Sequence, residues 1–205
     1  MRLNAALNRF LEEYPAAKTR PFAGDAVAEF VRREVPLAVE QVIGENERYI
    51  VHGSPGQGQW AGVPWIAVFD RFITETAQDG FYVVYLVKED FSGVYLSLNQ
   101  GVTTIRQVYG SGAKDALSAR ASDYVSRLGQ VDKSLILGSI DLKVSSSDSL
   151  GAFYEQGSIC AKYYKYSEIP NDEILENDLK EFLRLYLLLA TKDLVPASAS
   201  SEEDD

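Results

Sequence analysis

The first forty residues show the three-and-four spacing of apolar positions that is typical of amphipathic helices. Over residues 3–14 these positions are Leu3, Leu7, Phe10, Leu11 and Tyr14. We expect Pro15 to end this helix, because proline lacks the backbone N–H that a helix interior needs. Residues 24–35 repeat the spacing, Pro36 is expected to break it, and residues 37–43 to add a further helical turn or two.

Two later segments have the same helical spacing. Apolar residues recur at steps of three and four over 113–128, and Gly129 follows as a stop signal. The last helix is expected to begin after Asn171 or Asp172, either of which can cap it, and to end near Ala190. Its apolar face consists of Leu175, Leu179, Phe182, Leu183, Tyr186 and Leu187. Charged residues on the opposite face indicate a packing helix and not a membrane helix.

Short runs of aromatic and β-branched residues between these helices predict strands. The runs FYVVYLV (81–87) and VYLSL (94–98) are separated by KEDFSG, which is rich in turn-forming residues, so the pair predicts an antiparallel hairpin. The segment 145–151 is expected to be a polar connection. Further strands are expected over residues 49–51, 63–69, 135–144 and 159–166.

This order of elements predicts one domain of the α/β (α+β) class, with helices flanking a central twisted sheet that is mixed or mainly antiparallel. A chain of 205 residues is long enough for one such core. We assign the domain to residues 1–192 and interpret the acidic, Ser/Ala-rich segment 193–205 as a tail or linker. The first helix carries acidic residues and does not resemble a secretory signal, and no apolar run could span a bilayer, so a cytoplasmic location is predicted.

The composition argues against metal, cofactor and catalytic chemistry. Cys160 is the only cysteine and His52 the only histidine, so a disulfide within the chain and a site with several Cys or His ligands are both excluded. The carboxylates Asp70, Glu89 and Asp90 form no metal-binding motif and are better explained as solvated turn residues. We therefore predict no cofactor, no metal site and no enzymatic activity.

The glycine-rich segment GSPGQGQWAG, residues 53–62, is the strongest candidate for a ligand-binding loop, because glycines let backbone amides approach a ligand closely. It lacks the Gly-Lys-Ser/Thr ending of a nucleotide-binding P-loop, and no helix pattern follows it. Ser54 also lacks the context of a catalytic nucleophile. Two interpretations remain open, a flexible surface loop and a loop that contacts a ligand.

The order of several motifs carries more information than any one of them. The chain contains GxGxW, then PW, GFYVVYLVKED and GVYLSLNQG, then a basic-aromatic strand after YEQGSI, and finally a DLKEFLRLY helix. Over about residues 3–190 this order resembles the N-terminal specificity domain of McrB-like proteins, the DNA-recognition part of modification-dependent (type IV) restriction systems. The resemblance implies an α/β domain that binds DNA containing methylated cytosine and turns the modified base out of the duplex into an aromatic pocket.

Matched motif to motif, the resemblance also implies which residues form that pocket. The positions fall on Trp65, Tyr82, Leu86 and Gln57. A well-known member of the family has a tyrosine where this chain has glutamine, so Gln57 is a departure that affects the expected base preference. The remaining loop contacts expected from the resemblance are Ser54, Gln59 and Trp60.

Other interpretations of these residues stay open. Aromatic residues in strands such as Trp65 and Tyr82 more often pack in a core than stack on a ligand. Lys162 and Lys165 alternate with tyrosines and could contact a DNA backbone, but lysines on an edge strand also keep it soluble.

The net charge of −10 is unusual for a DNA-binding domain. It favours an alternative function, a protein-interaction or assembly domain of a defence system that uses an acidic surface. On the first interpretation the partners are double-stranded DNA with modified bases, an AAA+ GTPase motor domain and a nuclease subunit. The chain itself has no Walker-type loop and is not expected to hydrolyse GTP.

Overall fold

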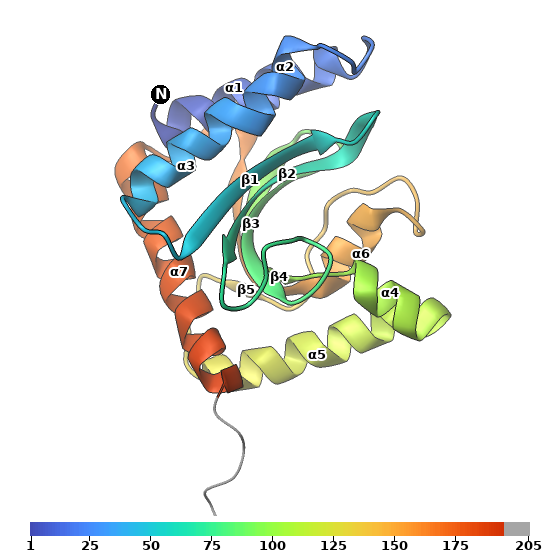
Figure 1. Cartoon of the computed structure of the whole chain (residues 1–205), viewed down its shortest axis with the longest axis vertical. Coiled ribbons are helices and arrows are strands. Elements are labelled where there is room, and N and C mark those ends of the chain that lie inside the picture. Colours follow the sequence, from blue (N-terminus) through green and yellow to red (C-terminus); the bar gives the residue numbers. More distant parts are fainter. Residues whose placement is uncertain (195–205) are drawn as a thin grey trace, which may run out of the picture.

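A six-stranded antiparallel sheet is the centre of the computed structural model, which describes residues 1–194 (Figure 1). The strand order is β1-β2-β3-β4-β6-β5. Successive strands from β1 to β4 are neighbours, so four of the six strands are built from consecutive hairpins. The strands are β1 Tyr49–Gly56, β2 Trp60–Asp70, β3 Phe81–Val87, β4 Gly93–Gln100, β5 Ile136–Leu137 and β6 Ser158–Lys165. The predicted single α+β domain with a mainly antiparallel sheet is confirmed.

The helices surround this sheet. In Figure 1 the N-terminal helices lie along one side, α5 lies along the other, and α7 runs between them and contacts β3 and β4. The helical elements are α1 Leu3–Ala17, α2 Ala26–Glu29, η1 Phe30–Glu34, α3 Val35–Ile43, α4 Thr103–Tyr109, η2 Gly110–Gly112, α5 Ala113–Leu128, α6 Leu150–Gly157, η3 Tyr166–Glu168 and α7 Asp172–Leu194. The predicted helix over 113–128 and the hairpin of β3 and β4 are confirmed.

Neither proline near the N-terminus ends its helix, contrary to the prediction. Pro15 lies within the last turn of α1, which continues to Ala17. Pro36 lies in the first turn of α3, where a missing N–H costs little, and the preceding element η1 is a π-helical segment. The N–H of Val35 donates to the carbonyl of Phe30, so the wider turn carries the helix past the proline.

Four other boundaries also differ from the prediction. The strand expected over 49–51 extends to Gly56, and the one expected over 135–144 is reduced to the two residues of β5. The segment 145–151 is not only a connection, because the hydroxyl of Ser149 accepts the N–H of Ala152 and so caps α6. Helix α7 continues to Leu194, and residues 195–205 of the predicted tail lie outside the described residues.

The two faces of the sheet are covered differently because side chains alternate along each strand. Phe81 of β3 contacts the rings of Tyr124 on α5 and Tyr186 on α7, with centroids 5.3 and 5.6 Å apart. The next residue, Tyr82, turns to the opposite face and contacts Phe69 of β2 at 5.2 Å. The first face is therefore the main core, and the second face is the one that presents the site described below.

Loss of the hydroxyl group should have opposite effects on stability at two buried tyrosines of this core. Within residues 1–194 the hydroxyl of Tyr85 is buried without a hydrogen-bond partner, whereas that of Tyr186 accepts the N–H of Asp70 at 3.0 Å. In urea denaturation we expect Tyr85→Phe to raise the free energy of unfolding by about 1 kcal/mol, and Tyr186→Phe to lower it by about 1–2 kcal/mol. Equal losses in the two variants would contradict this assignment.

Candidate nucleic-acid interface

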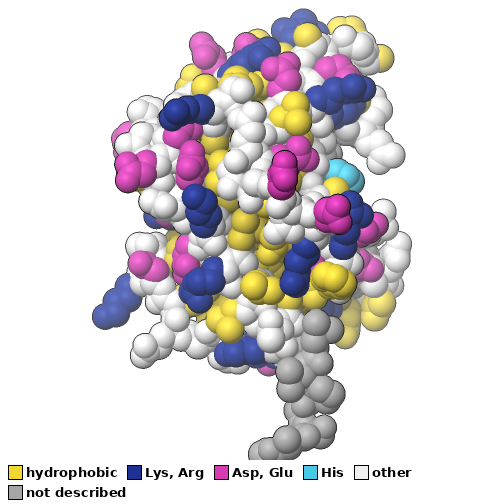
Figure 2. Space-filling model, turned by 60° about the vertical axis from the view of Figure 1, so that its left-hand side comes forward, with side chains coloured by type: hydrophobic (Ala, Val, Ile, Leu, Met, Phe, Trp, Pro, Cys, Tyr) yellow, Lys and Arg dark blue, Asp and Glu magenta, His cyan; other side chains and the backbone are white. Residues whose placement is uncertain are grey.

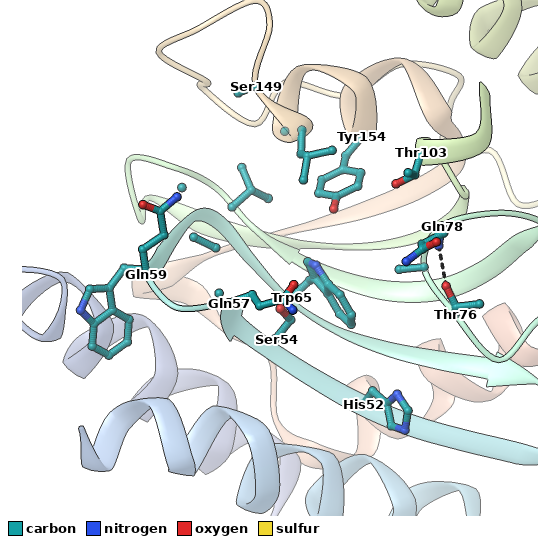
Figure 3. Close-up of a pocket in the computed structure, with 18 of the residues that line it drawn as sticks. His52, Ser54, Gln57, Gln59, Trp65, Thr76, Gln78, Thr103, Ser149 and Tyr154 are labelled. Carbon is teal, nitrogen blue, oxygen red and sulfur yellow. Dashed lines mark hydrogen bonds between the residues drawn. The ribbon is translucent and has the colours of Figure 1, made fainter. Parts of the chain in front are cut away.

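A cavity of about 600 Å³ opens on the second face of the sheet (Figure 3). Its walls come from four places in the sequence: the β1–β2 hairpin, the segment 75–78 between β2 and β3, Glu89 between β3 and β4, and α6 with its N-cap Ser149. Thr103 at the start of α4 completes the rim. The volume lies within the range of about 300–1,000 Å³ that is typical of pockets for small ligands.

The glycine-rich segment 53–62 is not a long loop but a tight hairpin. Strand β1 continues to Gly56 and β2 begins at Trp60, so only three residues form the turn. Gly58 has φ of +71°, a conformation that side-chain-bearing residues rarely adopt, which explains glycine at this position. Gln57 and Gln59 flank it and are exposed at the mouth of the cavity.

Aromatic contacts hold the turn end of this hairpin against the N-terminal helices. The indole N–H of Trp60 donates to the carbonyl of Arg20 at 2.9 Å, and its ring contacts those of Tyr14 and Phe22 with centroids 5.1 and 5.0 Å apart. The hydroxyl of Tyr14 lies 2.5 Å from the carbonyl oxygen of Pro55. Trp60 lines the cavity but is already engaged, so its main role is to position the hairpin.

Trp65 is the central aromatic residue of the cavity. It is half-buried, lies opposite Ser54 on β1 and Leu86 on β3, and directs its indole toward Tyr154 of α6 (Figure 3). Burial raises the pKa of Tyr154, and a hydrogen bond with the Trp65 side chain acts in the opposite direction. The Tyr154 hydroxyl therefore stays protonated at neutral pH and can donate a hydrogen bond within the cavity.

Tyr82 and Leu86, the other two residues that the resemblance assigns to the pocket, do not line the cavity. Their exposed fractions are 3% and 2%, and they lie beneath its wall. The hydroxyl of Tyr82 donates to the carbonyl of Ala77 at 3.3 Å, and its ring supports Phe69, which does line the cavity. The structure thus brings Trp65 together with the loop residues Gln57, Ser54, Gln59 and Trp60 and places Tyr82 and Leu86 underneath them.

The segment between β2 and β3 forms an ordered wall. The Thr76 hydroxyl accepts the N–H of Gln78 at 2.9 Å (Figure 3), and the Thr74 hydroxyl lies 3.0 Å from a carboxylate oxygen of Asp79. The N–H of Gly101 donates to the carbonyl of Gly80 at 2.9 Å and so ties this wall to β4. Polar side chains therefore face the cavity at fixed positions.

The three carboxylates Asp70, Glu89 and Asp90 occupy different environments. Asp70 is not a solvated turn residue, because its exposed fraction is 0% and it forms an ion pair with Arg48 at 2.6 Å. Glu89 lines the cavity, where its carboxylate accepts the N–H of Ser145. Asp90 is exposed in the β3–β4 turn and accepts the N–H of Ser92.

The single histidine, His52, and the single cysteine, Cys160, differ in solvent exposure. His52 is exposed at the rim of the cavity beside Phe69. Cys160 is buried in β6, and burial raises the pKa of its thiol to about 12. Across residues 1–194, His, Cys, Asp and Glu side chains form no cluster of three or more that could hold a metal ion.

The two lysines proposed as DNA contacts project from β6 in different directions. Lys162 forms an ion pair with Asp178 of α7 at 2.6 Å, and this places it on the core side of the sheet, away from the cavity. Lys165 is exposed at the end of β6 and is paired with Glu168 at 2.7 Å. Neither lysine lines the cavity.

Sequence reasoning missed the contribution of α6, including Tyr154. A signal was present: Ser149 is a favourable N-cap, Leu150, Phe153 and Tyr154 follow at helical spacing, and Gly157 can end a short helix. The polar run before Ser149 obscured that pattern. Gln78 and Thr103 have no comparable signal, because only the tertiary structure brings them to the rim.

Comparisons with known proteins identify the family. The family model described as "MrcB-like, N-terminal domain" matches residues 9–191, which is most of the chain. A search of curated proteins finds no match. No helix within residues 1–194 combines the length and apolar character needed to cross a bilayer. The match agrees with the resemblance found in the motifs, and the chain belongs to the family of MrcB-like N-terminal domains.

Proposed function

We propose that this domain binds double-stranded DNA that carries a modified base, 5-methylcytosine or a related modified cytosine, and accepts the flipped base in the cavity beside Trp65. The observation that carries the proposal is a half-buried indole at the centre of an open cavity of about 600 Å³, surrounded by amide and hydroxyl groups. A flipped base needs this combination, since its faces require stacking and its edge requires hydrogen bonds.

The energies involved are compatible with this role. Extruding a base costs a few kcal/mol, and stacking on an aromatic side chain returns roughly 1–3 kcal/mol per base. Trp65 provides such a surface, and Phe69 adds apolar surface for a methyl group. In this proposal Tyr82 and Leu86 support the two rings. Tyr82 packs under Phe69, and Leu86 is the cross-strand neighbour of Trp65.

Polar groups at the mouth are suited to read the edge of the base. The amides of Gln57 and Gln59 can donate and accept hydrogen bonds, which suits the mixed donors and acceptors of a cytosine edge. Ser54, opposite Trp65, adds a hydroxyl. The assignment of Gln57 to base recognition, and of Lys162 and Lys165 to backbone contacts, stays a prediction.

As a specificity module the domain would direct activities located elsewhere. We propose that an AAA+ GTPase motor domain and a nuclease subunit supply the catalysis, while this chain selects the site on DNA. The alternative, a protein-interaction domain with an acidic surface, requires a continuous acidic patch. On the face shown in Figure 2, basic and acidic side chains are instead interspersed.

Binding to four matched duplexes tests the proposal. The duplexes differ only in one base and contain cytosine, 5-methylcytosine, 5-hydroxymethylcytosine or N6-methyladenine. We expect the tightest binding to a modified cytosine and a steep loss of affinity with added salt, because phosphate contacts release counterions. Equal affinity for all four would refute recognition of a modified cytosine, and binding to protein partners but not to DNA would favour the alternative.

A further inference from the structure

A second hollow, of about 420 Å³, lies next to the base cavity and shares Thr103 with it. It is lined by Thr103, Arg106 and Gln107 of α4, by Gly110 of η2 and by Phe153 of α6. Thr103, Arg106 and Gln107 fall on one face of α4 because they are three and four residues apart. The hollow is therefore a polar extension of the rim.

Two cations are arranged around the ring of Phe153. The guanidinium carbon of Arg106 lies 4.4 Å from the ring centroid, and the ammonium nitrogen of Lys114 lies 5.3 Å from the same centroid. Arg106 comes from α4 and Lys114 from α5, so the fold brings together two charges that lie on separate helices. We call Arg106, Lys114 and Phe153 the Phe153 subsite.

These two cations differ from the basic residues that form ion pairs with acids. Arginines such as Arg20, Arg48 and Arg184 are neutralised by carboxylates at 2.6 to 2.9 Å. Among the ion pairs of the described residues, none involves Arg106 or Lys114. In a chain with a net charge of −10, two adjacent cations without acidic partners are a local positive region.

Glu155, an acid near Lys114, is engaged elsewhere. Burial raises the pKa of Glu155 and Lys114 acts in the opposite direction, but one carboxylate oxygen of Glu155 accepts the N–H of Leu142 at 2.7 Å. Lys114 itself donates to the carbonyl of Ser147 at 2.7 Å, which orients the ammonium group and leaves two of its three protons for a ligand. A guanidinium stacked on a ring likewise keeps its N–H edge free.

We infer that the Phe153 subsite binds a backbone phosphate of the DNA strand whose base enters the neighbouring cavity. The inference rests on the proposed function, because the phosphate belongs to the same DNA strand as the flipped base, and that strand would pass over Thr103, which the two hollows share. The planar edge of Arg106 matches two phosphate oxygens, and Lys114 supplies a second charge. The subsite would contribute affinity and position the strand, while the cavity selects the base.

The salt dependence of DNA binding tests this assignment. The full chain is compared with Arg106→Gln/Lys114→Gln and with Lys133→Gln/Lys180→Gln, a control that removes two exposed charges outside both cavities. The slope of log K against log salt is negative, and each lost phosphate contact should make it shallower by about 0.9. Relative to the wild type, the variant should therefore lose about eightfold more affinity per lost contact at 0.1 M salt than at 1 M salt. The loss should be equal for modified and unmodified duplexes, so that their affinity ratio is unchanged.

The outcomes separate this inference from the proposed function. An unchanged salt slope in Arg106→Gln/Lys114→Gln, or the same reduced slope in the control, overturns the subsite even if modified DNA is preferred. A reduced slope in the first variant alone, with no preference of the wild-type chain for any modified base, supports the subsite and refutes base recognition. A wild-type chain that binds no DNA overturns both. Circular dichroism melting of each variant establishes that the fold is retained.

Discussion

Replacing Trp65 with alanine should remove most of the preference for modified DNA and weaken binding to it by roughly 5- to 150-fold, which corresponds to the roughly 1–3 kcal/mol of one base–aromatic stack. Binding to unmodified DNA should change much less, because it depends on phosphate contacts that do not involve the cavity. Fluorescence anisotropy with matched cytosine and 5-methylcytosine duplexes measures both affinities. Trp65→Phe should retain part of the preference, since it keeps an aromatic face.

A matched control for this substitution lies in the same row of the sheet. Trp65, Leu86, Tyr95 and Tyr163 are successive cross-strand neighbours from β2 to β6. Tyr163 is half-buried and contacts Tyr95 with ring centroids 4.9 Å apart, but it does not line the cavity. Tyr163→Ala should therefore cost stability while leaving the affinity ratio intact. A loss of the ratio in both variants, or in neither, would argue that Trp65 is only a packing residue.

Replacing Gly53 with alanine should destabilise the domain by about 3 kcal/mol, because a new methyl group cannot fit without movement of the backbone. A Cβ atom at Gly53 would lie 1.8 Å from the carbonyl oxygen of Val31. Val31 belongs to the π-helical segment η1, which packs directly on the edge strand β1. The added methyl group would therefore push η1 away from the face of the sheet that it covers.

Gly112→Ala is the control for that experiment. A methyl group added at Gly112 would point into open space, with no neighbouring side chain or backbone within 4 Å, and the φ of −84° is accessible to alanine. The free energy of unfolding of this variant should stay within about 0.5 kcal/mol of the wild type, the range of ordinary surface substitutions. Denaturation in urea measures both variants. A Gly53→Ala variant as stable as Gly112→Ala would mean that η1 and β1 are not held in contact.

The local sequence pattern was sufficient to predict much of the fold and part of the candidate site. The β3–β4 hairpin and α5 follow from alternation and helical spacing, and Trp65 follows from the motif order. Pro15 and Pro36 were misleading because only two residues of α1 follow Pro15, and Pro36 follows a π-helical segment in the first turn of α3. Tolerance of a proline in a helix depends on the backbone around it and not on the residue itself.

The rest of the site depends on contacts between distant segments. Tyr82 has an aromatic ring that could stack on a base. Its position in β3 and its contact with Phe69 nevertheless leave it buried beneath that ring. Tyr154 enters the cavity only because α6 packs across the sheet. Arg106 and Lys114 meet at Phe153 for the same reason. Motif order could identify the region of the candidate site, but not which aromatic residue lines the cavity.

The β1–β2 hairpin separates the residues that hold it from the residues at its tip. Trp60, the residue that follows the turn, is held by Tyr14 and Arg20, whereas Gln57 and Gln59 within the turn are exposed at the cavity mouth. Substitutions at these two turn positions would alter the ligand-facing chemistry at little cost to stability. The same scaffold can therefore diversify in evolution by exchanging two side chains while the folded core is left untouched, and under the proposed function such exchanges would change which modified base is preferred.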